Sequence, residues 1–360
     1  MKNHYHLIIA GAGGIAEAAG LILAEWSAVT PTIYIGDRDL EKAQNVAQWI
    51  MNGTTKACKV QAFYLDANSI SDDMGRIFEK GDALLDCLPG SLAPNMARMA
   101  KTYKLCYANL TEYVAETNQI IQLAKDAQTG FVLQTGLAPG YIDVLAHHMF
   151  QNFCKKHKVE QVDTWSPVGV ATEYLKDCIV IRNYNKTSLP ALSERAYIII
   201  NGIGYEEDLT SGGAADLPDA LSGKVKHLDY KTLRHPLHYT WVGKQLKTLK
   251  NSKDPISGLQ EIMQTEIPHI EDDQIVLYAA VAGKDATGKF YRQEIAKHIK
   301  PQQIGKHTLR AIQTSTATPL IQAIAWLLDS KTKGVVLQSQ LDATAFLKGD
   351  FVKRVYGEIK

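Results

Sequence analysis

The sequence lacks long apolar runs, paired cysteines and an excess of either charge. No uninterrupted apolar stretch approaches the roughly 18 residues that a membrane-spanning helix needs. The five cysteines are odd in number and widely separated, which argues against a disulfide framework or a CxxC metal site. The 39 basic and 38 acidic side chains nearly cancel, which disfavours nucleic acid and anionic membranes as partners.

A signal peptide is also missing, since the first apolar run, residues 7–10, enters a glycine turn at once. Together with the unpaired cysteines, this predicts a cytoplasmic protein. The 360 residues include 46% hydrophobic ones, enough for more than one core.

The first 140 residues alternate short apolar runs with helical periods. Continuous apolar strands separated by helices are typical of a parallel sheet covered on both faces, so an α/β, doubly wound domain of the Rossmann type is predicted. The expected strands are 5–11, 31–37, 60–66, 82–89, 105–110 and 130–136, and the expected helices are 16–26, 40–51, 71–79, 92–102 and 112–128.

In the second half the apolar runs are β-rich and have no regular helical segments between them. This pattern predicts an α+β domain on a largely antiparallel sheet. Helical spacing returns at 309–329, where Pro319 must lie near a helix start or a kink. The predicted division is 1–140 for dinucleotide binding, 141–308 for substrate and dimerisation, and 309–360 for a helical segment on the first domain. The strands expected in the second half are 162–170, 177–185, 196–202, 226–234, 236–242, 275–283 and 290–299.

The stretch GAGGIA matches the GxGxxG/A turn of dinucleotide sites. Gly11 would make the sharp bend, Gly13 would let the backbone approach a pyrophosphate, and Ala16 would allow close helix packing. Gly14 adds clearance, and the helix start at Ile15 would aim its free N–H groups at the phosphates. The alternative is a tight turn that binds no nucleotide.

The next expected strand ends in an acid about twenty residues later, as dinucleotide sites require. Asp37 is placed to bind ribose hydroxyls and to repel a 2′-phosphate, which favours NAD. Arg38 follows directly and would instead suit the 2′-phosphate of NADP, so NADP remains possible.

Further cofactor contacts are expected where the other parallel strands end, because ligands bind at the carboxyl edge of such sheets. Asp66 would meet the adenine edge, or else cap the next helix. The remaining expected contacts, including the turn that joins the domains, are Leu88, Pro89, Asn109, Leu137 and Pro139.

Several motifs occur in a familiar order: GAGG, DCLP, QTGLAPGYID, TSGG and DYKTLR. In this order they resemble the saccharopine dehydrogenase-like family, and most nearly its lysine 6-dehydrogenase branch. The resemblance implies NAD-dependent oxidative deamination of an amino acid to a semialdehyde and ammonia, by a homodimer. GLAPG stands where saccharopine reductases tend to carry GLDPG.

The resemblance places the run Asp229–Arg234 beside the substrate. Arg234 would clamp a carboxylate, and Lys231 would bind the same group or act as an acid. The two are an odd number of residues apart, so a regular strand would point them to opposite faces and leave one as a surface charge. Arg182 is either a second clamp or a strand-edge charge.

A few residues are candidates for proton transfer. Glu112 is the first candidate for a base or an ammonium partner, and its alternative role is to stabilise the first turn of a helix. Asp143 is an alternative candidate, and its other role is to cap a helix. His238 would titrate near neutrality as a proton shuttle. Adjacent His147 and His148 point in different directions on a helix, so no metal site is expected.

Two other functions stay open. A saccharopine-type reductase would condense an amine with a carbonyl acid, and would need several carboxylate clamps, which Arg182, Arg195 and Arg234 do not exclude. A non-catalytic redox sensor would bind the dinucleotide and use its second domain for protein contact.

Overall fold

The computed structural model describes residues 4–157, 159–167, 174–267 and 270–359, so the last part of the strand expected at 162–170 lies outside these ranges. The chain forms two compact units. Unit 1 comprises Met1–Val144, Asp273–Ile275 and Ile299–Lys360, and unit 2 comprises Leu145–Asp272 and Val276–His298. The chain therefore leaves unit 1, builds unit 2 and returns to unit 1.

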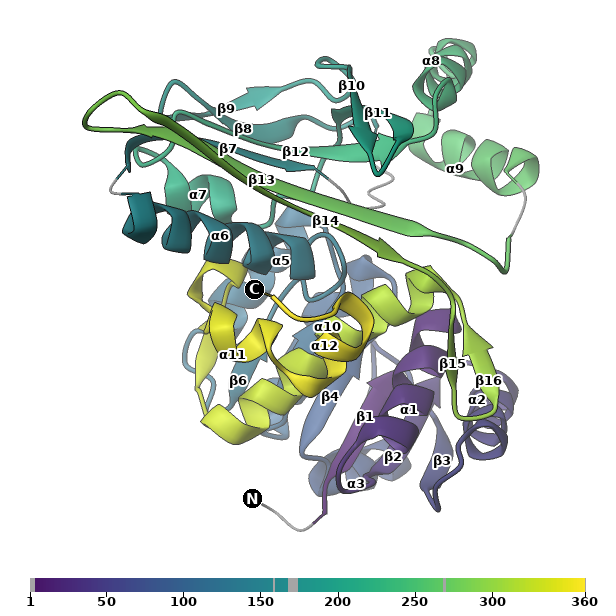
Figure 1. Cartoon of the computed structure of the whole chain (residues 1–360). Helices are drawn as coiled ribbons and strands as arrows, with labels where there is room; N and C mark the ends of the chain where they lie inside the picture. Colours follow the sequence, from purple (N-terminus) through teal and green to yellow (C-terminus); the bar gives the residue numbers. More distant parts are fainter. Residues whose placement is uncertain (1–3, 158, 168–173, 268–269, 360) are drawn as a thin grey trace. The chain divides into compact units, whose positions relative to one another are not determined.

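Unit 1 is built on a parallel sheet in the order β17-β6-β5-β4-β1-β2-β3 (Figure 1). The order reverses direction between β1 and β4, and such a switch point is where doubly wound sheets bind ligands. The predicted Rossmann-type sheet is confirmed. Its strands are β1 (His6–Ala10), β2 (Thr32–Asp37), β3 (Lys59–Tyr64), β4 (Ala83–Asp86), β5 (Cys106–Asn109), β6 (Gly130–Val132) and β17 (Gly334–Val336).

Helices cover both faces of this sheet. On one face, Ile8, Leu84 and Tyr107 pack against α3, α4 and α5 in a continuous apolar core. On the other face α1 packs closely on α2, since a Cβ at Gly20 would meet the side chain of Ile50 at 2.3 Å. The helices of the first half are α1 (Gly14–Trp26), α2 (Leu40–Gly53), α3 (Asp72–Lys80), α4 (Ala93–Thr102) and α5 (Val114–Ala124), with the short turn η1 (Gly90–Leu92).

The chain returns to unit 1 through the hairpin β15 (Gln302–Ile304) and β16 (His307–Leu309), and then through helix α10 (Ala311–Ser330). Pro319 lies in the interior of α10, and not near its start as one prediction had it. Proline has no N–H to bond the carbonyl four residues earlier, and the hydroxyl of Tyr356 donates to that carbonyl, on Ser315. The remaining elements are η2 (Gln338–Gln340), α11 (Ala343–Leu347) and α12 (Asp350–Tyr356).

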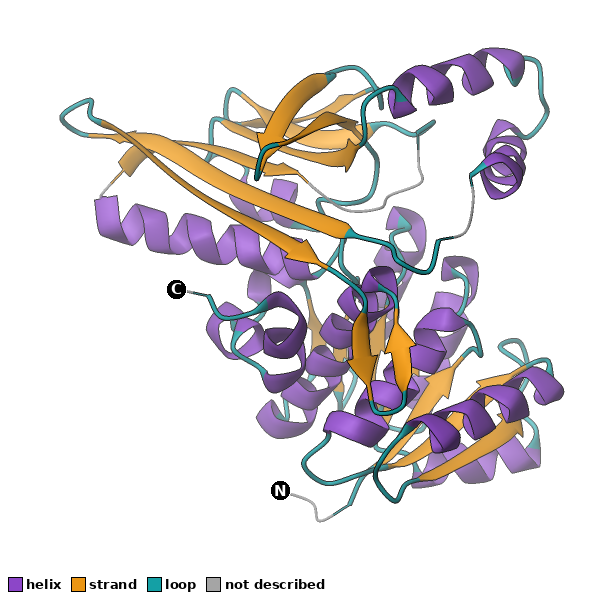
Figure 2. Cartoon of the chain, turned by 45° about the vertical axis from the view of Figure 1, so that its right-hand side comes forward, coloured by secondary structure: helices purple, strands orange, loops and turns teal. Residues whose placement is uncertain are grey.

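Unit 2 contains a mixed sheet in the order β10-β11-β12-β7-β13-β14, with β8 and β9 attached to β12. Only the pairing of β12 with β7 is parallel among the strand pairs with a described register. Figure 2 shows β13 and β14 as a long ribbon. The strands are β7 (Val159–Pro167), β8 (Cys178–Arg182), β9 (Asn185–Leu189), β10 (Ala196–Ile200), β11 (Ile203–Leu209), β12 (His227–Arg234), β13 (Ile275–Asp285) and β14 (Phe290–Ile299).

Helix α6 (Tyr141–His157) lies where a helix through His147 and His148 was expected. Three helices follow it, contrary to the prediction for this half of the chain: α7 (Leu217–Leu221), α8 (His238–Thr248) and α9 (Pro255–Glu266). The strand expected at 236–242 is wrong, since most of it forms the start of α8, where Tyr239 and Val242 are buried three residues apart. In the part of the chain that the structure describes, no helix has the length and apolar content to cross a membrane.

Candidate functional site

The turn after β1 has the geometry of a nucleotide-binding turn. Gly11 has φ +103°, in the left-handed region that favours glycine, and its N–H donates to the carbonyl of Gly36 on β2 at 2.7 Å. A Cβ on Gly11 would lie 3.1 Å from the carbonyl oxygen of Cys87, in the segment after β4. The turn therefore touches the loop across the switch point.

The start of α1 fits an anion. Gly13 is the N-cap and makes no side-chain cap bond, and a Cβ added there would meet nothing within 4 Å. Gly14 and Ile15 are partly exposed in the first turn. The N–H groups of a helix start and its positive dipole end suit a pyrophosphate in this open cradle.

Asp37 lies at the end of β2 and is tied to the glycine turn. Its Oδ2 accepts from the N–H of Ala12 at 2.8 Å, and its Oδ1 accepts from the N–H of Asp39 at 3.0 Å. The carboxylate is half-buried, whereas Arg38 is exposed. A carboxylate in this position suits ribose hydroxyls and opposes a 2′-phosphate.

A buried polar pair lies where β4 and β5 end. Asp86 is 2% exposed, accepts from the hydroxyl of Tyr107 at 2.7 Å and from the N–H of Leu88 at 3.0 Å. Burial raises the pKa of Asp86 to about 6, although both donors act to lower it. Asp86 was not predicted as a site residue. The sequence feature that could have indicated it is its position, because Asp86 is the second acid of DALLDCLP and ends an apolar strand.

Asn109, the strand neighbour of Asp86, is 1% exposed. Its Oδ1 accepts from the N–H of Gln134 at 2.9 Å, and its Nδ2 has no hydrogen-bond partner among the described residues. A buried donor without an acceptor fits a ligand carbonyl at this edge. Of the two residues expected after β4, Leu88 is half-buried and Pro89 is exposed.

Asp66 does not cap a helix. It accepts from the N–H of Asn68 at 2.8 Å and from the hydroxyl of Ser69 at 2.7 Å, in a local turn after β3. These bonds lower the pKa of Asp66. The N-cap of α3 is Ser71 instead, so the helix-cap alternative is wrong and the adenine-edge alternative stays a prediction.

The GLAPG turn precedes α6. Leu137 and Pro139 are buried, and Gly140 has φ +141°. The N–H of Gly140 donates to Asp143 Oδ2 at 2.8 Å, so Asp143 stabilises the start of α6. Glu112 is half-buried and precedes α5 by two residues, so the acid in the first turn of that helix is Glu116.

In unit 2, Arg234 ends β12 with an enclosed guanidinium. Its Nη2 donates to the hydroxyl of Tyr174 at 3.4 Å, and its buried Nε has no partner among the described residues. Tyr230 and Tyr239 lie close enough for their charge states to interact with it. Among the described residues, no carboxylate forms an ion pair with Arg234. An enclosed cation of this kind is costly without an anion.

Lys231 points to the other face of β12. It forms an ion pair with Glu207 at 3.3 Å, and both side chains are about 7% exposed. Burial raises the pKa of Glu207 while the charge of Lys231 opposes this effect. The opposite orientation follows from strand alternation, but neither Lys231 nor Arg234 is an exposed surface charge.

The other two arginines already have carboxylate partners. Arg182 Nη2 contacts Glu194 at 2.5 Å and Asp229 at 2.9 Å. Arg195 Nε contacts Asp208 at 3.3 Å. These pairs favour a structural role for both arginines, because a ligand carboxylate would have to compete with acids of the chain.

His238 starts α8 near Arg234. Its Nε2 lies 3.3 Å from the hydroxyl of Tyr174. Desolvation lowers the pKa of His238 to about 4, and the charge of Arg234 adds to the effect. The ring is therefore neutral at neutral pH, and the expectation that His238 titrates near neutrality as a proton shuttle is wrong. No group of three described His, Cys, Asp or Glu side chains is placed to hold a metal ion.

The TSGG loop packs against β12. Gly212 has φ +90°, and a Cβ on Gly213 would lie 2.1 Å from the ring of Tyr230. Glycine is needed at 213 because the tyrosine ring occupies the space of a side chain.

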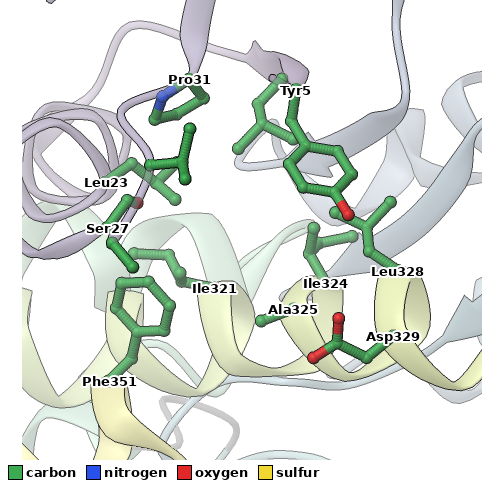
Figure 3. Close-up of a pocket in the computed structure, with 13 residues that line it drawn as sticks. Tyr5, Leu23, Ser27, Pro31, Ile321, Ile324, Ala325, Leu328, Asp329 and Phe351 are labelled. Carbon is green, nitrogen blue, oxygen red and sulfur yellow. The ribbon is translucent and has the colours of Figure 1, made fainter. Parts of the chain in front are cut away.

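A separate hollow of about 540 Å³ lies in unit 1 between α1, α10 and the start of β1. Figure 3 shows its apolar walls, with Leu23, Ile321 and Phe351 on one side and Tyr5 and Asp329 on the other. Tyr5 precedes β1, whereas the glycine turn follows it. The walls carry a carboxylate and no cation, so this hollow is unsuited to a polyphosphate.

Comparison with known proteins gives a family match within unit 1. Residues 7–133 match the family model of the saccharopine dehydrogenase NADP-binding domain. This segment is therefore similar to the NAD(P)-binding domain of that family.

Two solved structures share the fold of the whole chain at 12% identity. One is saccharopine dehydrogenase (L-Glu forming) from Saccharomyces cerevisiae, with a TM-score of 0.75 over 98% of each chain. The other is homospermidine synthase from Legionella pneumophila in complex with NAD, with a TM-score of 0.63 over 98% of this chain and 90% of that one. They support the predicted α/β fold with a second domain.

Proposed function

We propose that the protein is an NAD(P)-dependent oxidoreductase that acts on a carbon–nitrogen bond of an amino acid. Unit 1 binds the dinucleotide, and Arg234 binds the carboxylate of the substrate. The observation that carries this proposal is the enclosed guanidinium of Arg234, which has no carboxylate partner among the described residues. A substrate carboxylate would supply the missing anion with two-pronged geometry.

The charge pattern favours a substrate with one carboxylate. Arg182, Arg195 and Lys231 each contact an acid of the chain, whereas Arg234 forms no ion pair with any residue that the structure describes. Arg234 is therefore the proposed partner of the substrate carboxylate. Lysine fits this pattern, so the proposed reaction is oxidative deamination of the lysine 6-dehydrogenase type. Saccharopine carries more carboxylates, and the saccharopine-type reductase is therefore the second candidate.

In the proposed reaction the substrate amine must first lose its proton. Glu112 is the proposed base or ammonium partner. His238 is uncharged at neutral pH, but burial and the charge of Arg234 lower its pKa to about 4, which makes it a weak base for this step. A bound nicotinamide ring supplies the hydride acceptor. Loss of a hydride from the carbon that bears the neutral amine leaves a carbon–nitrogen double bond. Water then adds to that carbon, and the carbon–nitrogen bond breaks to release ammonia and a semialdehyde.

Asp37 supports NAD as the preferred cofactor. Its carboxylate accepts from the N–H of Ala12 in the glycine turn and from the N–H of Asp39 after β2, so it would repel a 2′-phosphate from a fixed position. Gly11, Gly13, Gly14 and Ile15 form the proposed pyrophosphate cradle, and Asn109 Nδ2 is the proposed donor at the nicotinamide side.

Steady-state kinetics of Arg234→Gln tests the proposal. We expect KM for the amino acid to rise roughly 30- to 100-fold, since a charge-assisted contact is lost, with unchanged affinity for NADH. Arg292→Gln is the matched control, because Arg292 is an exposed arginine of unit 2. An equal loss of affinity for the amino acid and for NADH, or an unchanged KM for the amino acid, would contradict the role of Arg234. Binding of NADH without turnover on any amino acid or amine would favour the redox sensor.

A further inference from the structure

We infer that Arg310, the residue before α10, contacts the phosphates of the dinucleotide held by the glycine turn. The inference rests on the proposed dinucleotide binding of unit 1 and deepens it. Arg310 is nearly 300 residues away from the glycine turn along the chain, and no motif points to it.

The start of α10 lies against the start of α1. The side-chain Nε2 of Gln313 donates to the carbonyl of Gly14 at 2.9 Å, and its Oε1 accepts from the N–H of Arg310 at 3.0 Å. A Cβ added at Gly14 would lie 3.8 Å from Nη2 of Arg310. The guanidinium therefore lies beside the first residue of the helix whose N–H groups form the cradle.

Asp273 fixes the position of Arg310. Its two carboxylate oxygens accept from the N–H groups of Ala311 at 2.5 Å and of Ile312 at 2.9 Å. This side chain caps α10 and balances the positive end of its dipole. The start of α10 is thus held in place by Asp273 on one side and by Gln313 on the other.

The charges around the first turn of α1 call for a cation. Glu17 is half-buried there, and burial raises its pKa while the charges of Lys42 and Arg310 act to lower it. A dinucleotide adds negative phosphate charge at the same end of the helix. Arg310 is placed to offset both and to donate to phosphate oxygens in two-pronged geometry.

Calorimetric titration of the purified protein with ADP-ribose and with adenosine tests the inference, since only ADP-ribose carries the pyrophosphate. We expect Arg310→Gln to weaken ADP-ribose binding roughly 10- to 30-fold and to leave adenosine binding unchanged. Arg310→Lys should give an intermediate loss, because it keeps the charge without the planar fork. Arg354→Gln, an exposed arginine over the ring of Trp26 in unit 1, should bind like wild type.

The outcomes separate this inference from the proposed function. If wild type binds neither ligand, the proposed function fails and the inference fails with it. If wild type binds ADP-ribose and Arg310→Gln binds it equally well, or loses both ligands alike while remaining folded, the inference alone fails. If Arg310→Gln does not fold, Arg310→Lys decides: a loss confined to ADP-ribose supports the contact, and unchanged binding overturns it.

Discussion

At the residue scale, Asp86 makes stability depend on pH. Its pKa of about 6 in the folded chain exceeds the ordinary value of 3.8, so the folded state holds the proton more tightly. Stability from this group is present at low pH and is lost as the pH rises through about 6. Asp86→Asn removes this loss. We expect the variant to gain about 3 kcal/mol over wild type between about pH 4 and pH 7, as measured by urea unfolding.

The asparagine can keep the local bonds. Its amide can donate to the hydroxyl of Tyr107, which can then donate to the carbonyl of Ala93, now 3.3 Å away. A difference in unfolding free energy that does not change with pH would show that Asp86 is not the titrating group.

Asp37 has a different role, because its carboxylate acts on the choice of cofactor. Asp37→Ser removes the negative charge and shortens the side chain that holds the N–H of Ala12. We expect NADH to bind about 10-fold more weakly and the preference for NADH over NADPH to shrink or reverse. Fluorescence titration with both cofactors measures this. Asp39→Ser is the control, since it keeps a cap on α2, and an unchanged preference in Asp37→Ser would contradict the account.

At the element scale, α10 keeps a proline in its interior with the help of α12. Tyr356→Phe leaves the buried carbonyl of Ser315 without the hydroxyl donor, so we expect unfolding free energy to fall by about 1–3 kcal/mol. Pro319→Ala restores the N–H that bonds the same carbonyl. In a double-mutant cycle by urea unfolding, Tyr356→Phe should therefore cost less in the Pro319→Ala background. Equal losses in both backgrounds would mean that the hydroxyl does not replace the missing N–H.

The elements of unit 1 were predictable because its strands are apolar and are bounded by turn residues. Several elements of unit 2 were not, and β11 and α8 show why. In β11, Glu206, Glu207 and Asp208 stand in a row, a composition that is rare in strands, and pairing with β12 overrides it. At the start of α8, the aromatic run from His238 resembles a strand, whereas its burial at 239 and 242 follows the helical period.

The candidate site residues were likewise predictable only in part. The glycine turn and Asp37 were visible because consecutive residues of one strand–turn–helix unit make them. Three features depend on residues distant in sequence: Arg234 forms no ion pair among the described residues, Arg182 pairs with two acids, and Gln313 approaches Gly14. The spacing of residues in the sequence cannot predict such contacts, because they arise only when the sheets and helices pack.

At the scale of the whole molecule, we propose a homodimer. β10 ends the described order of the unit 2 sheet, and Tyr197 and Ile199 on it are 72% and 77% exposed. We expect wild type to sediment as a dimer and Tyr197→Lys to shift it toward monomer. Val114→Lys, which changes an exposed apolar residue of unit 1, should leave the dimer intact. A monomeric wild type, or a dimer that Tyr197→Lys leaves unchanged, would contradict the proposal.

The central claim concerns the reaction itself. The most direct measurement follows the absorbance of reduced nicotinamide when wild-type protein is mixed with NAD or NADP and with L-lysine, ornithine, saccharopine or a diamine at alkaline pH. The account predicts reduction of NAD with L-lysine, release of one ammonia for each reduced cofactor, and little reaction with the diamine, which lacks the carboxylate for Arg234. Tight binding of NADH with no reduction on any of these substrates would contradict it.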